Sequence, residues 1–513
     1  MPRALLSVYD KSGLTEFASQ LNYLGIEIIA SGGTAKTLQD AGLAVTSIES
    51  LTGVHEMLGG RVKTLHPAIH AGILARRTPQ DSSELAGAGY PEIDLVVCNL
   101  YPFQETVAKP GITLQDAIEQ IDIGGVALLR AAGKNFLNVT VVCDPADYDR
   151  VAAALAYSHE ADLALRRDLA IKAFAHTRDY DTAIHAFLSR DMAPNMTAND
   201  ALPPQLSIAA HQVETLRYGE NPHQSAAYYS QDGRGGPLGG TVIGGKQLSY
   251  NNILDLDAAW RAVSSFNAPT VVIVKHLNPT GIATGQTIAE AYPAALASDA
   301  VSAFGGVIAV NRLVDEAFVN ALGSLFVEAI AAPAFSDDAV AQLNAGRKNC
   351  RLLQVPQPFD GNGIEIRSVH RGLLVQRSDM GDPDHTLLKT VTERTPTADE
   401  MAAFGFAWKA VQHVKSNAIV IAGANTTYGI GGGLSSRVDA VKLAVDKAGE
   451  NARGAVLASD AFFPFPDGVE AAAQAGITAI IQPGGSIRDS EVIETANRLQ
   501  IAMIFTGTRH FRH

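Results

Sequence analysis

The stretch Val271-Val272-Ile273-Val274-Lys275-His276-Leu277-Asn278-Pro279-Thr280-Gly281 places a cation and an imidazole directly after four β-branched residues. Such a run predicts a short, fully buried strand, and Pro279 and Gly281 should end the regular structure soon afterwards. Lysine can neutralise a developing oxyanion and histidine can move a proton near pH 7, so a strand ending in both suits acyl or formyl transfer. An isolated Lys-His pair, however, is more often an ordinary surface feature.

The composition is that of a soluble globular protein with several domains. The chain has 513 residues, of which 47% are hydrophobic and 18% charged, and this length predicts two to four domains. No run approaches the roughly 20 apolar residues that span a bilayer, and the first residues do not resemble a signal peptide. Three widely spaced cysteines indicate neither disulfides nor zinc, which fits the cytoplasm. A net charge of −13 argues against a nucleic-acid binder.

Strands and helices alternate along the first 190 residues. Residues 3–8, 26–30, 94–98 and 139–143 are predicted strands with helical patterns between them. This alternation predicts a parallel sheet with helices on both faces and ligands at the C-terminal strand ends. The second strand runs into Ser31-Gly32-Gly33-Thr34, which opens a helix, and the free N–H groups of a helix start favour a phosphate. Glycine-rich turns of this kind are also common without a ligand.

Three further stretches fall where loops at the same sheet edge are expected. They are 59–67 (GGRVKTLHP), 98–103 (CNLYPF) and 121–126 (IDIGGV), the last leading into a helix that reaches Arg130 and Lys134. Each has an ordinary explanation, since loop cations are usually solvated and an aspartate before Ile-Gly-Gly can simply cap a helix. Together, their cations, tyrosine and aspartate predict an anionic-substrate site with proton-transfer groups.

Residues 191–210 are polar and punctuated by prolines, so we expect a linker between a domain at 1–190 and another at 211–513. In the second of these, the order strand, loop, helix, strand and Ser/Phe loop occurs twice. The two Ser/Phe loops are 302–306 and 459–465. The repetition suggests two duplicated subdomains, with a boundary near 380–400.

Five long motifs, SGGTAKTL, GGRVKTLHPAIHAGILARR, CNLYPF, QIDIGGVALLRAAGKN and VTVVCDPADY, resemble a bifunctional purine-biosynthesis family. That family joins an IMP cyclohydrolase to a 5-aminoimidazole-4-carboxamide ribonucleotide (AICAR) formyltransferase, and the resemblance extends to the last residues. It implies an α/β fold: an N-terminal methylglyoxal-synthase-like parallel-sheet domain, then duplicated cytidine-deaminase-like α/β subdomains. The zinc signature of true deaminases, H-x-E with P-C-x-x-C, is absent, so no catalytic metal is expected.

The implied reactions are formyl transfer from 10-formyltetrahydrofolate to the 5-amino group of AICAR, then closure of formyl-AICAR to IMP with loss of water. For ring closure, the resemblance implies that Asp122 accepts the proton of the carboxamide nitrogen. Lys63, with Tyr101 or Lys134, would protonate and stabilise the formyl oxygen, and the principal acid stays open. The implied substrate contacts of this domain are Ser7, Lys11, Ser31, Gly32, Thr34, Arg61, Thr64, Cys98, Asn99, Gly124 and Gly125.

For formyl transfer, the resemblance implies that His276 takes the proton of the attacking amine. Lys275 would stabilise the tetrahedral oxyanion or assist the leaving nitrogen, and Asn417 would hold the carboxamide or formyl group. Phe304, Phe462 and Phe463 would sandwich flat rings, although these aromatics could equally be core residues. The other implied nucleotide and folate contacts are Arg217, Tyr218, Gly305, Glu328, Arg437, Ser486, Arg509 and His513.

The C-terminal residues 508–513 would ordinarily be a frayed tail, but the resemblance predicts that they are ordered and line the nucleotide site. It also implies a cytoplasmic homodimer with formyltransferase sites at the subunit interface, small-molecule substrates, and no nucleic-acid or membrane partner. One alternative is a chain with a single active half, hinted at only by Tyr9, where the family more often has serine. Another is a nucleotide-binding regulatory protein, although a sensor needs no proton-transfer groups such as Lys275-His276 and Asp122.

Overall fold

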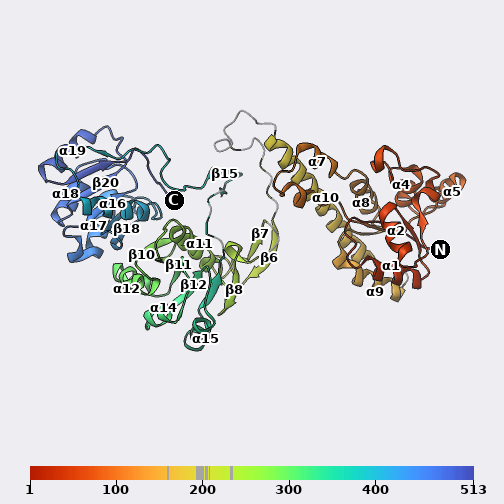
Figure 1. Cartoon of the computed structure of the whole chain (residues 1–513), viewed down its shortest axis with the longest axis horizontal. Coiled ribbons are helices and arrows are strands. Elements are labelled where there is room, and N and C mark those ends of the chain that lie inside the picture. The colour runs from red at the N-terminus through yellow and green to blue at the C-terminus, as the bar shows by residue number, and fades with distance from the viewer. Residues whose placement is uncertain are drawn as a thin grey trace. The chain divides into compact units, whose positions relative to one another are not determined.

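The computed structural model describes residues 1–158, 161–191, 202, 206, 208, 210–231, 235–356, 358–359, 361 and 363–513. The chain divides into two compact units, Met1–Ser207 and Ile208–His513 (Figure 1). Most of the expected linker at 191–210 lies outside the described residues. In the part that the structure describes, no helix combines the length and the apolar character needed to cross a membrane.

The first unit is built on a five-stranded sheet in the order β3-β2-β1-β4-β5, and every neighbouring pair is parallel. The central strands are apolar and buried, as is typical when helices cover both faces. The predicted parallel sheet is therefore confirmed. Its strands are β1 (Arg3–Ser7), β2 (Glu27–Ala30), β3 (Thr46–Ser47), β4 (Leu95–Cys98) and β5 (Thr140–Val142).

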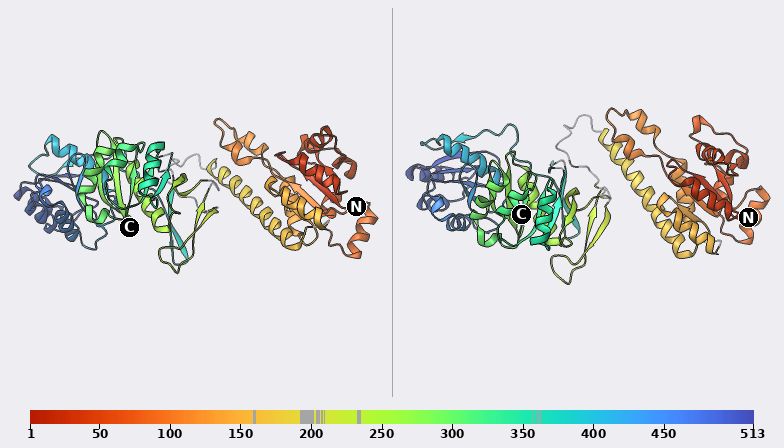
Figure 2. Two further views of the ribbon diagram at one scale, coloured as in Figure 1. Left: turned by 90° about the horizontal axis from the view of Figure 1, so that it is seen from below. Right: turned by 60° about the horizontal axis from the view of Figure 1, so that its bottom comes forward.

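Helices connect these strands, and the longest, α10 (Leu163–Asp191), runs along α8 and β5 (Figures 1 and 2). Since all strands are parallel, their carboxyl ends meet at one edge of the sheet. The remaining helices of the unit are α1 (Leu14–Tyr23), α2 (Gly32–Asp40), α3 (Ile48–Thr52), α4 (Pro67–Leu74), α5 (Pro79–Ala88), α6 (Phe103–Val107), α7 (Leu114–Glu119), α8 (Gly124–Lys134) and α9 (Tyr148–Ser158).

The second unit contains two six-stranded sheets, ordered β10-β9-β11-β12-β13-β8 and β16-β21-β20-β19-β17-β18. In each, one strand (β9 or β17) is antiparallel to both neighbours, three successive strands are parallel, and the far edge strand is antiparallel. The two topologies match strand for strand, which confirms the predicted duplication.

The first of these sheets comprises β8 (Thr241–Gly244), β9 (Thr270–Lys275), β10 (Asn278–Thr284), β11 (Gly306–Val310), β12 (Val327–Ala332) and β13 (Arg351–Gln354). The second comprises β16 (Lys389–Thr390), β17 (Ile419–Ala422), β18 (Thr427–Gly431), β19 (Val456–Ser459), β20 (Ala479–Gln482) and β21 (Ala502–Phe505). Two separate hairpins are β6 (His211–Leu216) with β7 (Ala226–Ser230), and β14 (Ile364–Val369) with β15 (Gly372–Arg377).

The helices of this unit follow the same duplicated order. They are α11 (Tyr250–Ser264), α12 (Ile288–Ser298), α13 (Ala300–Ala303), α14 (Glu316–Ala321) and α15 (Asp337–Gly346), then α16 (Ala398–Val411), α17 (Arg437–Ala448), α18 (Asp467–Gln474) and α19 (Asp489–Arg498). Side chains of α11 and α16 share one apolar core with residues of both sheets. The two subdomains are therefore packed together and do not stand apart.

The prediction that Pro279 and Gly281 end the regular structure is wrong. β10 runs through both residues and pairs antiparallel with β9. Pro279 is tolerated because β10 is the edge strand of its sheet and the register shifts beside it. A Cβ at Gly281 would collide with the carbonyl oxygen of Ala295, so the close approach of α12 requires this glycine.

The edge strands β10 and β18 lie side by side where the two subdomains meet. The Thr427 hydroxyl accepts from the Ile282 N–H at 2.9 Å and donates to its carbonyl at 3.2 Å. At the other end of β10, the Asn278 side-chain oxygen accepts from the Lys415 N–H at 2.9 Å. This contact brings the turn that carries Lys275-His276 beside the start of β17.

Candidate active sites

Small polar groups gather in the first unit at the start of α2. The hydroxyls of Ser7 and Ser31, at the ends of β1 and β2, lie 2.9 Å apart. The Ser31 side chain does not cap α2, so the N–H groups of Gly32 and Gly33, which precede the first helical bond from Thr34, are available to an anion. Thr34 has a structural role instead, because its buried hydroxyl bonds both the N–H and the carbonyl of Val8 at 3.1 Å.

Lys63 reaches this helix start. Its Nζ lies 3.5 Å from the position of a Cβ built on Gly32, and it forms an ion pair with Glu56 at 2.9 Å. Arg61, the other predicted cation of this loop, pairs with Glu119. Neither glutamate was predicted as a partner: Glu119 belongs to α7, far along the chain, and no motif marks it.

Asp122 lies just before α8 and is partly buried. Its Oδ1 accepts from the Gly125 N–H at 2.7 Å. Burial raises the pKa of this carboxyl, against the lowering by hydrogen bonds from the N–H groups of Gly125 and Tyr101. A carboxylate with a raised pKa is a stronger proton acceptor than a solvated one. A Cβ at Gly125 would lie 2.6 Å from Asp122 Oδ2, so the carboxylate occupies space that only glycine leaves.

A tyrosine of α10 supports the Asp122 loop, and no sequence motif pointed to it. The Tyr180 hydroxyl accepts from the Asp122 N–H at 2.8 Å and donates to the Gln120 carbonyl at 2.7 Å. Cys98 lies beside the same loop and is 1% exposed. Burial raises the pKa of its thiol well above the ordinary value, so Cys98 stays protonated and its side chain faces the core. The expected substrate contact can therefore come only from its backbone.

The loop after β1 uses two more of the predicted residues. Asn99 accepts from the N–H groups of Tyr9 at 2.6 Å and Asp10 at 3.0 Å. Lys11 donates to the carbonyls of Val8 at 3.0 Å and Tyr9 at 3.3 Å, and burial lowers its pKa. The rings of Tyr9 and Tyr101 meet edge to face with centroids 5.6 Å apart. Tyr101 is 39% exposed, so its hydroxyl is accessible to a substrate.

Lys134 lies at the opposite end of α8 from Asp122. It is the last residue of α8, whereas Asp122 precedes the first residue, Gly124. At 1.5 Å per residue, α8 places Lys134 about 15 Å from Gly124. The role expected of Lys134, to act with Lys63 on the formyl oxygen, stays a prediction. Thr64 does reach the helix start, since a Cβ at Gly124 would lie 2.6 Å from its hydroxyl.

In the second unit, a tight turn carries the Lys275-His276 pair. His276 and Leu277 have φ of 51° and 67° and close the β9–β10 hairpin, as in turns with two left-handed residues. Asp255 of α11 holds the turn: its Oδ1 accepts from the Leu277 N–H at 2.7 Å, and the His276 N–H also donates to it. Burial raises the pKa of Asp255 despite these two bonds. Sequence reasoning missed Asp255, which carries no motif.

Lys275 points to the loop that follows α13. Its Nζ donates to the Phe304 carbonyl at 2.6 Å. Gly305 has a φ of 70° and donates to the carbonyl of Phe326 at 2.8 Å. The exposed Phe304 ring lies 5.5 Å from that of Phe326. The structure thus brings Lys275, Phe304 and Gly305 together, and adds Phe326.

Asn417 is oriented by a buried ion pair. Its side-chain oxygen accepts from Arg437 Nη2 at 2.8 Å, and its nitrogen donates to the Leu434 carbonyl at 2.9 Å. Arg437 Nη1 donates to Asp460 Oδ1 at 2.5 Å, and Asp460 is completely buried. Arg437 is itself 7% exposed. The guanidinium therefore holds Asn417 in place, and the ligand contact expected of Arg437 itself stays a prediction.

The prediction that Phe463 stacks on a ligand is contradicted by its burial. Its side chain is 1% exposed and packs in the core of the second subdomain. Phe462 is only partly buried and remains accessible. The alternation of burial along this short segment turns one ring outward and one inward, which the repeated aromatics of the motif could not show.

The remaining predicted contacts lie in several parts of the unit. Glu328 on β12 forms an ion pair with Arg351. The Ser486 hydroxyl accepts from the Arg488 N–H at 3.1 Å. The Arg217 guanidinium lies 5.4 Å from the centroid of the Tyr218 ring. None of these contacts involves Lys275, so the ligand contacts expected of Glu328, Ser486, Arg217 and Tyr218 stay predictions.

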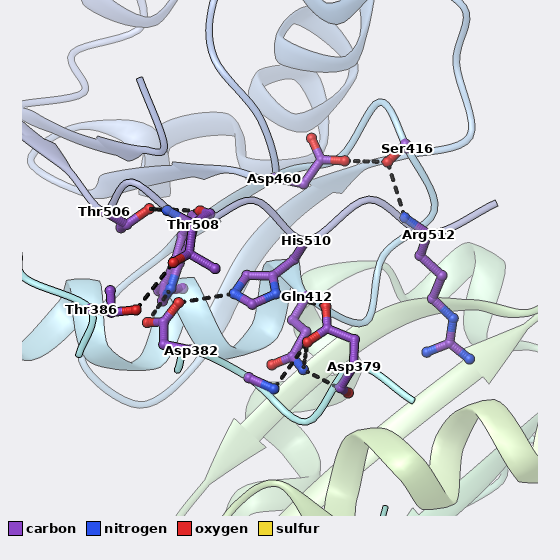
Figure 3. A network of polar contacts seen from close by, with 12 residues as sticks. Asp379, Asp382, Thr386, Gln412, Ser416, Asp460, Thr506, Thr508, His510 and Arg512 are labelled. Atoms are coloured by element: carbon purple, nitrogen blue, oxygen red, sulfur yellow. Dashed lines mark hydrogen bonds and ion pairs between the residues drawn. The ribbon is translucent and has the colours of Figure 1, made fainter. Parts of the chain in front are cut away.

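Hydrogen bonds hold the C-terminal tail, residues 506–513, against the second subdomain (Figure 3). The His510 N–H donates to the Asp460 carbonyl at 3.0 Å, and the Ser416 N–H donates to the Arg512 carbonyl at 2.8 Å. A cavity of about 1130 Å³ is lined by residues of this tail, including Phe511 and His513, and by Leu277 and Lys415. The tail, Leu277 of the β9–β10 turn and the segment before β17 therefore line one cavity.

Two family models match this chain. The model described as AICARFT/IMPCHase bienzyme matches residues 132–447, and the model described as MGS-like domain matches residues 13–127. Curated relatives named bifunctional purine biosynthesis protein PurH match all of this chain. That of Sorangium cellulosum is 49% identical over 99% of its own length, that of Desulfitobacterium hafniense 48% over 99%, and that of Listeria monocytogenes serotype 4b 49% over 100%.

Proposed function

Because the chain belongs to the AICARFT/IMPCHase bienzyme family, we propose that its two units divide the two reactions between them. The chain is a bifunctional AICAR formyltransferase and IMP cyclohydrolase of purine biosynthesis. We assign ring closure to Met1–Ser207 and formyl transfer to Ile208–His513. The observation that carries this function is full-length identity of 48–49% to proteins of that name.

In our proposal for formyl transfer, the 5-amino nitrogen of AICAR attacks the formyl carbon of 10-formyltetrahydrofolate. A C–N bond forms, the carbonyl oxygen becomes an oxyanion, and the bond to the folate nitrogen then breaks. His276 accepts the proton of the attacking amine, whose lone pair is delocalised into the imidazole ring, and general-base catalysis of this kind is typically worth about 10²–10⁴-fold. The proton then passes to the leaving nitrogen.

Lys275 supplies the positive charge for this step. Its Nζ, at 2.6 Å from the Phe304 carbonyl, is fixed at the end of a buried strand and can stabilise the oxyanion without rearrangement. Asn417, held by Arg437 and the Leu434 carbonyl, would orient the carboxamide of AICAR. The exposed ring of Phe304 beside Phe326 offers a face to the flat ring of the folate.

In our proposal for ring closure, the carboxamide nitrogen of formyl-AICAR attacks its own formyl carbon. Asp122 accepts the amide proton, a role that suits a carboxylate whose pKa is raised by burial. Lys63, with Tyr101 or Lys134, donates a proton to the formyl oxygen, which becomes a hydroxyl on the new ring. Asp122 then returns its proton to this hydroxyl, which leaves as water while the nitrogen that carried the formyl group loses its proton and the C=N bond forms. The substrate phosphate would lie at the start of α2, against Ser7, Ser31 and the Gly32 N–H, because helix starts bind anions. Lys63, whose Nζ is close to Gly32, would lie between the phosphate at the start of α2 and the formyl group that reacts.

The proposal extends to the formyl donor, the assembly and the cellular location. The formyl donor is a reduced formyl folate, as the family implies, and specifically 10-formyltetrahydrofolate. The working form is a cytoplasmic homodimer whose formyltransferase sites lie at the subunit interface. Substrates are small molecules, and among the residues that the structure describes no group of three or more acids, histidines or cysteines could hold a metal ion.

Turnover of AICAR and 10-formyltetrahydrofolate by the full chain tests the proposal, with released folate and IMP measured separately. Lys275→Ala should stop folate release, whereas Lys63→Ala should release folate and accumulate formyl-AICAR. The exposed lysines Lys348 and Lys109 provide matched controls, one from each unit. Folate release without IMP in the wild-type chain would show that the first unit is inactive. Nucleotide binding without either product would favour a regulatory protein instead.

A further inference from the structure

His510 occupies an unusual position in the C-terminal tail. Its side chain is 2% exposed, yet both ring nitrogens face carboxylates: Nδ1 lies 2.7 Å from Asp379 Oδ2, and Nε2 lies 3.1 Å from Asp382 Oδ1 (Figure 3). Ionised carboxylates only accept hydrogen bonds, so both ring nitrogens must donate. The geometry therefore requires a buried imidazolium between two anions.

Both carboxylates are themselves oriented by α16. The indole N–H of Trp408 donates to Asp382 Oδ2 at 2.9 Å, and the Trp408 ring lies 5.2 Å from the imidazole. The Gln412 amide donates to the Asp379 carbonyl at 3.1 Å and to its Oδ1 at 3.3 Å. Asp379 and Asp382 lie between β15 and β16. His510 thus fastens the end of the chain to this connecting segment and to α16.

The tail around His510 has a two-residue pattern of burial. His510 is buried and Arg512 half-buried, whereas Arg509, Phe511 and His513 are exposed, as expected of an extended chain with one face against the protein. Phe511 and His513 line the cavity, and the Arg509 guanidinium lies 4.7 Å from the centroid of the Phe511 ring. A bond that fixes His510 therefore sets the direction of the three exposed side chains.

We propose that His510 is a positioning residue of the formyl-transfer site: clamped between Asp379 and Asp382, it holds the tail so that Arg509, Phe511 and His513 flank the nucleotide. This rests on the proposed function, which puts Arg509 and His513 on the nucleotide. The tail backbone also bonds Ser416 and Asp460, which adjoin Asn417. The clamp would therefore set the tail relative to the group that holds the carboxamide.

The clamp has a defined pH dependence. Burial lowers the pKa of His510, but the bonds and charges of Asp379 and Asp382 raise it more, so its pKa lies above the ordinary value. His413 interacts electrostatically with His510, and Lys409 and Arg512 in turn act on His413. Burial lowers the pKa of His413 to about 3, so this ring stays neutral. Because the pKa of His510 is raised, the clamp is intact below that pKa while both carboxylates remain ionised, and it loosens as pH rises through that pKa.

The test compares His510→Gln with His370→Gln, an exposed histidine in the β14–β15 turn. A glutamine cannot donate in both directions, so the KM for AICAR should rise about tenfold or more, with kcat within about twofold. Ring closure of formyl-AICAR should not change. Above about pH 8, where the substrate phosphate is almost completely ionised because its second pKa is about 6, the wild-type KM should rise with pH and that of His510→Gln should not. An unchanged KM, or an unchanged pH profile, overturns the proposal.

Hydrogen exchange separates failure of the clamp from failure of the proposed nucleotide contacts. Amides of residues 508–513 should exchange about tenfold faster in His510→Gln than in the wild type. Wild-type exchange in that variant overturns the clamp. Faster exchange with an unchanged KM overturns the positioning role. If the KM for AICAR rises in His510→Gln but is unchanged in Arg509→Ala and His513→Ala, the clamp is supported. The nucleotide contacts assigned to Arg509 and His513 are then refuted.

Discussion

Removing the carboxylate of Asp255 should disable formyl transfer without touching ring closure. Asp255 is not expected to contact a substrate. Its carboxylate accepts hydrogen bonds from the N–H groups of Leu277 and His276, in the turn that presents Lys275 and His276. Both turn residues have positive φ, which costs an L-residue about 1–2 kcal/mol each. We therefore expect the turn to relax in Asp255→Ala and to move the His276 imidazole away from the amine.

The size of the effect follows from these bonds. A hydrogen bond to a charged group contributes about 1.5–3 kcal/mol, so two such bonds offset the strain of the turn with little to spare. If the relaxed turn costs about 3 kcal/mol of transition-state stabilisation, kcat falls roughly a hundredfold, since each 1.4 kcal/mol is a factor of ten. Asp255→Asn keeps an accepting oxygen but loses the charge, and should fall by about tenfold.

The assay measures folate release from AICAR and 10-formyltetrahydrofolate, with closure of separately supplied formyl-AICAR as the internal reference. Asp338→Ala, which removes an exposed acid of α15, is the matched control. The positioning role of Asp255 is refuted if Asp255→Ala keeps kcat within about threefold of the wild type while its folding is intact. Equal loss of both activities would refute it too, because it would point to general damage.

Three other changes give separate expectations. Gly125→Ala should push the Asp122 carboxylate aside and reduce ring closure by about 10²-fold, measured as IMP formed from formyl-AICAR, with folate release unchanged as the control. Arg437→Met should leave the buried carboxylate of Asp460 unpaired and destabilise the second unit by about 3–5 kcal/mol; an unchanged urea midpoint would contradict this. Ring closure should lose its base as pH falls through the pKa of Asp122, which burial raises above 3.8, so the acidic limb of the rate profile should lie above that of an ordinary aspartate and should shift or vanish in Asp122→Asn.

Local sequence patterns were sufficient for the buried central strands, because the apolar run that marks such a strand lies within the strand itself. Runs such as Leu95–Cys98 and Thr270–Lys275 are apolar at nearly every position, and a buried strand needs nothing more. The alternation with helices likewise predicted the parallel order of the first unit. The repeated order of elements in the second half predicted two sheets with one topology, and both sheets have it.

Positioning residues escaped prediction because tertiary contacts define them. Asp255, Tyr180 and His510 act on residues distant in the chain, and each belongs to a residue type that is common on helices and loops. The neighbouring sequence does not mark them as positioning residues. An aspartate that accepts two N–H groups in the folded protein is written with the same letter as an aspartate in solvent. Burial also decided between two adjacent rings, turning Phe463 into the core.

The sequence by itself determined the buried central strands, the two units' fold class and the presence of Lys275-His276 and Asp122 at strand and loop ends, because periodicity and residue chemistry are properties of short segments. Only the tertiary structure decided that Pro279 and Gly281 continue a strand, that Lys134 stands at the far end of α8, and that Arg437 serves Asn417. Those outcomes depend on which surfaces come into contact. β10 packs against α12, and Arg437 of α17 pairs with Asp460, and both contacts join segments that are distant in the sequence.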